Sequence, residues 1–246
     1  MSDRARETEF RGIGVVVAGG NLGVGPAVVQ AFAAESACVA IGVLPGTTPM
    51  TDLPKGVYQH ACDLFDPDVF LDACEAQVGL VRVLVVVPPP VRTMGALDVE
   101  PSEMEAIVEQ ELLGPMRLIQ ACARRMVEKG IGGRIMSFVS MSGKTGVHPR
   151  VAPFAAAKGG LIAYSRSLAA ELAPHGVTVN AIATALFDVQ LAGKSDEERA
   201  AIEAGIPVGR AGRSEEAAHA ALFLASDRAG YVTGETLSLS GGRFMD

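Results

Sequence analysis

A glycine-rich turn near the start of the chain holds the first residues that could do chemistry. Gly19, Gly23 and Gly25 fall within Ala18-Gly19-Gly20-Asn21-Leu22-Gly23-Val24-Gly25, directly after an apolar run. Glycines so placed allow a tight turn and let backbone N–H groups approach a pyrophosphate at a helix N-terminus. The spacing predicts a nucleotide-phosphate site, although the same glycines would also serve packing of a strand against a helix.

The contacts expected beside that turn are missing. An acidic residue at the end of the second strand normally holds the adenosine ribose. Here the chain reads Ile41-Gly42-Val43-Leu44-Pro45, with neither an acid nor an arginine, and the nearest acid is Asp52. We therefore expect this chain to bind no dinucleotide, and the sequence gives no basis for choosing between NAD and NADP.

Short apolar runs alternate with longer helical patterns, and these elements must position the turn. Strands are predicted at 13–18, 37–43, 57–61, 81–87, 134–139, 177–182 and 236–239, and helices at 25–35, 66–78, 102–128, 154–172 and 215–225. Near-continuous apolar strands separated by helices indicate a parallel sheet covered on both faces. The sequence predicts an α/β fold with a doubly wound, Rossmann-type parallel sheet in a single domain over residues 1–246.

The composition excludes several classes of partner. The 246 residues carry a net charge of −7, whereas nucleic acids and anionic membranes require clustered Lys and Arg. No apolar run is long enough to span a membrane, and the first 11 residues lack the apolar region of a signal peptide. Cys38, Cys62, Cys74 and Cys122 form no C-x-x-C pair. We expect them to be reduced and mostly buried in a cytoplasmic protein.

Further motifs follow the glycine turn along the chain, and together with it they resemble the pattern of a known family. Asp63 follows the third strand, a serine follows the fifth, and a lysine lies early in the next helix. The C-terminal stretch contains Pro207-Val208-Gly209-Arg210, Phe223-Leu224-Ala225-Ser226-Asp227, Thr233-Gly234-Glu235-Thr236-Leu237 and Gly241-Gly242. The whole chain resembles the short-chain dehydrogenase/reductase family, and this stretch is similar to the 3-oxoacyl-(acyl carrier protein) reductase branch.

The resemblance implies a hydride-transfer enzyme that uses NAD(H) or NADP(H) and the catalytic set Asn, Ser, Tyr and Lys. The serine position is Ser140 and the lysine position is Lys158, but the proton-donating tyrosine is Phe154 and the asparagine is Glu111. Phenylalanine cannot act as a general acid. The resemblance therefore leaves Ser140 and Lys158 as remnants of the catalytic set. It leaves Gly19, Gly23, Gly25 and Asp63 as remnants of a degenerate cofactor site.

Other positions that touch nicotinamide or substrate in the family are also changed. The Asn-Asn-Ala-Gly motif is Val86-Val87-Pro88-Pro89, the Pro-Gly after the sixth strand is Thr184-Ala185, and the following threonine is Val189. Successive prolines remove backbone N–H donors and should crowd a pocket. We expect Glu111 to lie near Lys158 and partly neutralise it, the alternative being a solvated helix residue.

Three side chains are candidate substitutes for the missing tyrosine, and one of them, Tyr231, lies near the C-terminal interface region. Tyr164 lies ten residues after Phe154 on one predicted helix, about 15 Å along its axis, and cannot reach the site. His148 precedes Phe154 in a loop and is the candidate replacement acid, the alternative being a solvated loop histidine.

These features favour a non-catalytic or impaired subunit of a hetero-oligomeric NAD(P)-dependent dehydrogenase. It would join an intact paralogue in a heterotetramer through the long helices and the C-terminal strand edge. The partner would bind NAD or NADP and act on a 3-hydroxyacyl or 3-oxoacyl thioester of CoA or acyl carrier protein. One arrangement that the chain resembles is the two-subunit (hydroxy(phenyl)methyl)succinyl-CoA dehydrogenase of anaerobic toluene degradation, which has a degenerate subunit.

Two alternatives remain open from the sequence. One is a stand-alone lyase or isomerase that uses Ser140, Lys158 and Glu111 without hydride transfer. The other is a reductase that uses Ser140, Lys158 and a water molecule.

Overall fold

One parallel sheet organises the chain. The computed structural model describes residues 9–145 and 148–245. Its strands are β1 (Gly14–Ala18), β2 (Cys38–Val43), β3 (Val57–Ala61), β4 (Val81–Val86), β5 (Gly133–Ser140), β6 (Val177–Thr184) and β7 (Thr236–Leu239). They pair in parallel in the order β3-β2-β1-β4-β5-β6-β7. The order reverses between β1 and β4, which places the expected ligand crevice at the carboxyl ends of these strands.

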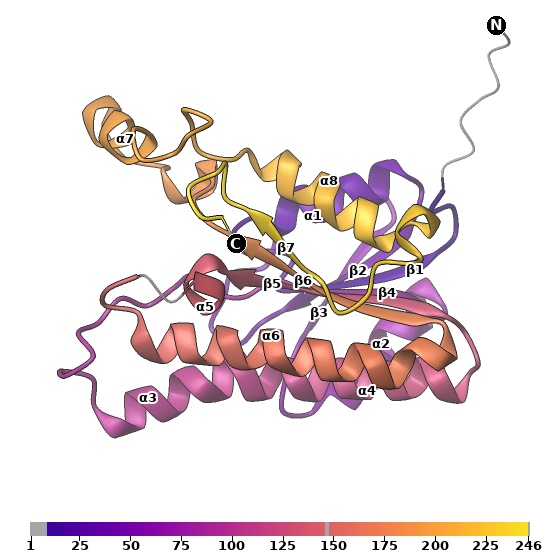
Figure 1. Ribbon diagram of the computed structural model, residues 1–246. Coiled ribbons are helices and arrows are strands. Elements are labelled where there is room, and N and C mark those ends of the chain that lie inside the picture. The colour runs from indigo at the N-terminus through magenta and orange to yellow at the C-terminus, as the bar shows by residue number, and fades with distance from the viewer. Residues whose placement is uncertain (1–8, 146–147, 246) are drawn as a thin grey trace, which may run out of the picture.

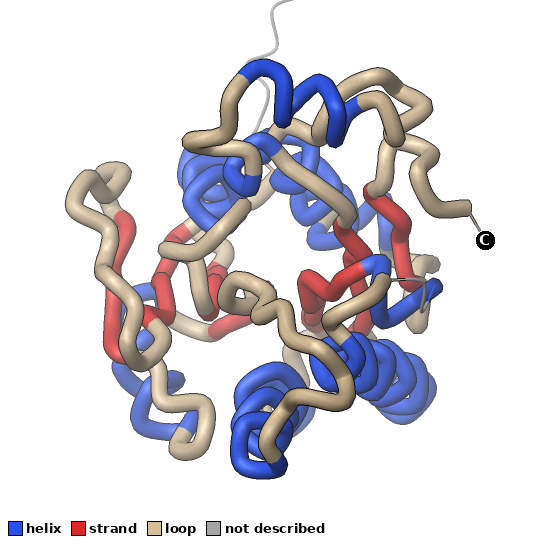
Figure 2. The backbone as a smooth tube through the Cα atoms, turned by 90° about the vertical axis from the view of Figure 1, so that its left-hand side faces the viewer, coloured by secondary structure: helices blue, strands red, loops and turns tan. Residues whose placement is uncertain are grey.

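Helices cover both faces of the sheet. They are α1 (Gly25–Ala34), α2 (Pro67–Val78), α3 (Pro101–Val108), α4 (Gly114–Glu128), α5 (Met141–Thr145), α6 (Ala152–Leu172), α7 (Asp196–Glu203) and α8 (Ser214–Ala225). Helices α1 and α8 lie on one face, and α2, α4 and α6 lie on the other (Figure 1). Figure 2 shows the strands in a row between these two layers. The predicted doubly wound α/β fold is confirmed.

The apolar strands are explained by burial on both faces. Along β1, Val15 and Val17 belong to one buried cluster, whereas Val16 belongs to the other. Successive side chains of a strand point to opposite faces, so a strand between two helical layers needs apolar residues at every position. The same alternation separates Leu84 from Val85 in β4.

The helix predicted at 102–128 is three segments in the structure. A π-helical turn, Glu109–Leu113, joins α3 to α4. Helices α5 and α7 are not among the predicted helices, although the sequence at the start of α7 carries a recognisable N-terminal signal. The Ser195 hydroxyl accepts a hydrogen bond from the Glu198 amide, and the Glu198 carboxylate accepts one from the Ser195 amide, which is a capping box.

Two further expectations concern the cysteines and the membrane. All four cysteines are free thiols, and all but Cys38 are buried, as predicted. Burial raises the pKa of Cys62, Cys74 and Cys122 to about 12, which keeps these thiols protonated and unreactive. Within the described ranges, no helix is long and apolar enough to cross a membrane.

Candidate active site

The glycine turn links the end of β1 to α1. Gly19 has a φ of +74°, and a β-carbon there would collide with the Val87 carbonyl oxygen. A β-carbon on Gly25 would lie 2.7 Å from the Gly19 carbonyl oxygen. Gly23 has a φ of +50°, which also favours glycine. Packing and backbone conformation thus account for all three glycines, and phosphate binding by the turn stays a prediction.

Asn21 draws the loop after β2 over this turn, which the sequence analysis did not foresee. The Asn21 side-chain amide donates hydrogen bonds of 2.9 Å to the Thr47 hydroxyl and to the Thr48 carbonyl oxygen. The Asn21 Oδ1 atom is shielded and has no hydrogen-bond partner in the part of the chain that the structure describes. In the sequence, the polar side chain of Asn21 within the glycine turn is the feature that could have indicated this contact.

The residues around the turn could contact the phosphates of a dinucleotide but not its two ends. Glycines directly after the first strand would let backbone N–H groups at the start of α1 approach a pyrophosphate. At the adenosine end, Val43 and the buried Leu44 offer neither an acid nor a cation. At the opposite end, Val87 is buried, with its amide bonded to the Ala18 carbonyl oxygen at 2.8 Å, and prolines follow it. The ribose and nicotinamide contacts of the family are therefore not supplied by these residues.

Glu111 and Lys158 form a buried ion pair between the π-helical turn and α6. The Lys158 Nζ atom lies 2.8 Å from Glu111 Oε2, and the two side chains are 1% and 6% exposed. Burial lowers the pKa of Lys158, while the charge of Glu111 and its hydrogen bond oppose this shift. Glu111 therefore lies where the neutralising hypothesis put it, and the solvated-residue alternative is wrong.

Phe154 lies in an apolar cluster directly beside this ion pair. Its ring packs with Ile107 and Val151, and Met94 lies against them. The Lys158 Nζ atom is 5.5 Å from the ring centroid, within the range of a cation–π contact. The Met94 amide donates a 2.7 Å hydrogen bond to the Arg150 carbonyl oxygen, which ties the two loops together near Phe154.

Ser140 ends β5, and α5 begins immediately after it. Its hydroxyl oxygen accepts hydrogen bonds from the Ser142 hydroxyl at 2.8 Å and from the Ser142 amide at 3.1 Å. Helix α5 packs closely on α6, since a β-carbon on Gly143 would lie 2.6 Å from the Lys158 β-carbon. The hydroxyl of Ser140 is thus engaged by Ser142, a contact that the sequence analysis did not include.

The remaining predicted residues lie apart from the ion pair. Asp63 is exposed after β3, and its carboxylate accepts a 2.8 Å hydrogen bond from the Phe65 amide. His148 is half-buried, with its ring centroid 4.7 Å from that of Phe244, so it is not a solvated loop residue. Its action as a replacement acid stays a prediction. The Tyr164 hydroxyl contacts the Met116 carbonyl oxygen on α4.

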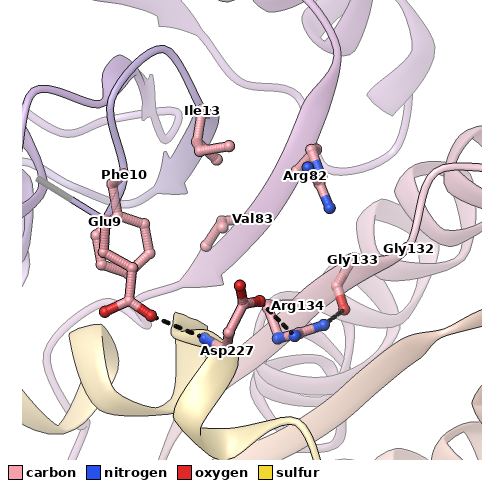
Figure 3. A pocket seen from close by; sticks show the side chains of 9 residues that line it. All are labelled: Glu9, Phe10, Ile13, Arg82, Val83, Gly132, Gly133, Arg134 and Asp227. Atoms are coloured by element: carbon pink, nitrogen blue, oxygen red, sulfur yellow. Dashed lines mark hydrogen bonds and ion pairs between the residues drawn. The ribbon is translucent and has the colours of Figure 1, made fainter. Parts of the chain in front are cut away.

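A separate crevice opens where the strands begin. It measures about 90 Å³ and is lined by Glu9, Phe10, Ile13, Arg82, Val83, Gly132, Gly133, Arg134 and Asp227. Figure 3 shows Arg134 between its two partners, the Gly133 carbonyl oxygen and the Asp227 carboxylate. None of the predicted site residues lines it, so it is not a part of the candidate active site.

The sheet order, the glycine turn after β1 and the positions of Ser140 and Lys158 together define a dehydrogenase-type fold. The chain belongs to the short-chain dehydrogenase/reductase family. A family profile described as enoyl-(acyl carrier protein) reductase matches residues 18–243.

Similar proteins place the chain in a branch of that family. It is 36% identical to the 3-oxoacyl-[acyl-carrier-protein] reductase FabG of Escherichia coli (strain K12), over 96% of this chain and 99% of the relative. It is 35% identical to the reductase MabA of Mycobacterium avium, over 94% and 89%. A crystal structure of a short-chain type dehydrogenase/reductase from Mycobacterium marinum matches with a TM-score of 0.84, 27% identity and 98% coverage of both chains. The resemblance to the 3-oxoacyl reductase branch is confirmed.

Proposed function

We propose that this chain is the non-catalytic subunit of a hetero-oligomeric, NAD(P)-dependent short-chain dehydrogenase. Its partner is an intact paralogue that binds NAD or NADP, and the two assemble as a heterotetramer in the cytoplasm. The partner acts on a 3-hydroxyacyl or 3-oxoacyl thioester, in keeping with the acyl-carrier-protein substrates named for the relatives. At its most specific, the proposed substrate is (hydroxy(phenyl)methyl)succinyl-CoA.

The buried pair of Lys158 and Glu111 beside Phe154 carries this proposal. Reduction of a carbonyl needs a proton for the new hydroxyl, and a positioned acid contributes roughly 10²–10⁴ in rate. Phe154 has no proton to give, and it is 6% exposed in an apolar cluster. The charge of Lys158 is compensated by Glu111 rather than directed at a neighbouring acid.

A groove on the outer side of α4 and α6 supports a docking role. It measures about 660 Å³. Its lining residues are Gln120, Ala123, Arg124, Val127, Glu128, Tyr164, Ser167, Leu168, Glu171, Leu172 and His175. An apolar floor with a rim of both charges is typical of a protein–protein interface. We place the paralogue on this surface, which we call the α4/α6 groove.

The experiment is to produce the chain alone and together with an intact paralogue from the same source. Calorimetric titration of the isolated chain with NAD and NADP should show no binding. The paralogue alone should lose activity on 3-hydroxyacyl-CoA substrates, and adding this chain should restore it. Tight dinucleotide binding by the isolated chain, or full activity of the paralogue by itself, would refute the proposal.

Turnover by the isolated chain without nicotinamide would instead support a lyase or isomerase. That outcome would require Lys158 and Glu111 to reach a substrate, although both are buried. The Ser140→Ala variant separates the two functions. It should leave complex formation and the activity of the complex unchanged under the subunit proposal, whereas a stand-alone enzyme that uses Ser140 would lose its turnover.

A further inference from the structure

The C-terminal segment after β7 brings two nitrogen-bearing side chains against one aromatic ring. The Arg243 guanidinium carbon lies 5.7 Å from the Phe244 ring centroid, and the His148 ring centroid lies 4.7 Å from it. His148 comes from the loop before α6, so the cluster joins segments about a hundred residues apart in the sequence. We call Arg243, Phe244 and His148 the C-terminal cluster.

Both nitrogen-bearing side chains of this cluster have an unsatisfied atom. Arg243 Nη1 and His148 Nε2 are shielded from solvent and make no hydrogen bond within residues 9–145 and 148–245. A shielded polar group without a partner is strongly unfavourable, so native proteins rarely leave one unexplained. Five other arginines of the described chain pair with carboxylates, namely Arg125, Arg134, Arg210, Arg213 and Arg228. Arg243 has no such partner among the described acids.

The backbone that carries Arg243 is held in place. The Ser240 hydroxyl donates to the Phe244 carbonyl oxygen at 2.9 Å and accepts from the Phe244 amide at 3.3 Å. The Val208 amide donates to the Gly241 carbonyl oxygen at 3.1 Å. The guanidinium of Arg243 is therefore presented by a fixed turn, which favours a preorganised binding site.

We propose that the C-terminal cluster is a binding site for an oxyanion, a carboxylate or phosphate group held between Arg243 and His148. The planar guanidinium suits two-point recognition of either group. An oxyanion also supplies the acceptor that both shielded nitrogen atoms lack, with His148 donating in its protonated form. This site does not depend on the proposed function.

Proton linkage gives the site a diagnostic property. Burial and the neighbouring charge of Arg243 lower the pKa of His148 from 6.5. Arg243 is the charged side chain of the C-terminal cluster, and its positive charge opposes protonation of His148. An anion between the two side chains reverses this effect, since it favours the imidazolium. Binding should therefore raise the pKa of His148, and the affinity for acetate, which stays ionised near neutral pH, should increase as the pH falls toward that raised pKa.

The test is NMR of the full chain, following the His148 ring during titration with sodium phosphate, sodium acetate or sodium chloride at constant ionic strength. Phosphate or acetate should saturate and raise the pKa of His148, while chloride should not. Response to phosphate alone assigns the site to phosphates, and response to both anions assigns it to carboxylates as well. The Arg243→Gln variant should weaken binding at least tenfold, and Arg243→Lys should restore part of it.

Arg228→Gln is the matched control, since it removes an arginine that already pairs with Glu9 at an exposed position. It should bind as the wild type does. Identical shifts with chloride, or unchanged binding in Arg243→Gln, would overturn the proposal. Circular dichroism of each variant confirms that the fold is kept, and Arg243→Lys provides the result if Arg243→Gln does not fold.

Discussion

A single buried ion pair dominates the chemistry at the residue scale. Lys158 is 1% exposed, and its ammonium lies against the Glu111 carboxylate and near the Phe154 ring. Removing a charge from water is expensive, and a buried pair recovers this only with good geometry. Each member therefore depends on the other, and a change at one position leaves an uncompensated charge in the core.

Glu111→Gln should destabilise the protein by about 3–5 kcal/mol, because it leaves the Lys158 cation buried without its counter-charge. Urea unfolding followed by circular dichroism measures this. The double variant Glu111→Leu, Lys158→Met removes both charges and should recover most of the lost stability. Glu105→Gln, at an exposed position on α3, should stay within about 0.5 kcal/mol of the wild type. Equal stability of Glu111→Gln and Glu105→Gln would contradict this account.

Phe154→Tyr should not create a dehydrogenase in the isolated chain. A tyrosine there would gain a hydroxyl, but Lys158 would remain paired with Glu111 and Pro88–Pro90 would remain in place. The expected result is no NADH formation above the level of the Phe154→Leu control in a spectrophotometric assay with 3-hydroxyacyl-CoA. Measurable turnover would show that the missing hydroxyl alone explains the loss of activity.

At the scale of elements, the π-helical turn and α5 build the site. The turn of Glu109–Leu113 carries Glu111, which is 4% exposed although α3 before it is largely exposed. Helix α5 is only five residues long, and it is held against α6 where Gly143 meets Lys158. Single π-helical turns within helices are frequent at functional sites.

Gly143→Ala should destabilise the contact between α5 and α6 by about 1–3 kcal/mol, since overpacking forces neighbours to move. The added carbon would lie 2.6 Å from the Lys158 β-carbon. Gly205→Ala is the matched control, because the nearest atom to its added carbon is 3.7 Å away and its φ is not left-handed. Thermal unfolding of both variants gives the comparison. A loss as large in Gly205→Ala would show that the packing contact is not the cause.

Asp188 connects the segment after β6 to the start of α8 and predicts a pH effect. Its carboxylate accepts a 2.6 Å hydrogen bond from the Ser214 hydroxyl. Burial raises its pKa, but hydrogen bonds from Ser214 and from the Val189 amide outweigh this and lower it below 3.8. A lowered carboxyl pKa stabilises the fold above pH 3.8, and that contribution is lost as the pH falls through the folded value.

Asp188→Asn should therefore destabilise the protein by about 1 kcal/mol at pH 7, because the amide replaces charge-assisted hydrogen bonds from Ser214 with weaker neutral ones. The difference from the wild type should shrink as the pH is lowered below 3.8. Denaturant unfolding at pH 7, 5 and 3 measures it, with the exposed Asp52→Asn as the control. A difference that stays constant with pH would rule out the carboxylate as the source.

The sequence predicted the regular elements well and the irregular ones poorly. Strand β3 was placed at its observed bounds, and the apolar runs identified the other strands because burial on both faces leaves a local signal. The π-helical turn leaves no such signal, since its extra residue per turn arises from packing in three dimensions. The link between Asn21 and Thr47 spans 26 positions and depends on the fold bringing two loops together.

At the scale of the whole molecule, the chain keeps the fold of its family, and Lys158 lies beside Glu111 and Phe154. The sheet order and the covered faces match an ordinary member, with a TM-score of 0.84 to a solved relative. Although Phe154 supplies no acid, a stably folded chain can still bind a partner protein through its surface. The α4/α6 groove is one such surface, and it lies on the outer side of the helices rather than at the sheet edge that carries Ser140.

Ser167→Arg should block assembly with the paralogue, because it places a long charged side chain on the exposed rim of the α4/α6 groove. The isolated variant should keep the circular dichroism spectrum and unfolding midpoint of the isolated wild-type chain. In analytical ultracentrifugation the wild-type mixture should sediment as one heterotetramer, and the variant mixture as separate species. Thr51→Arg, the same change at an exposed loop position away from the groove, should assemble normally. A complex that forms equally well with Ser167→Arg would place the partner on another surface.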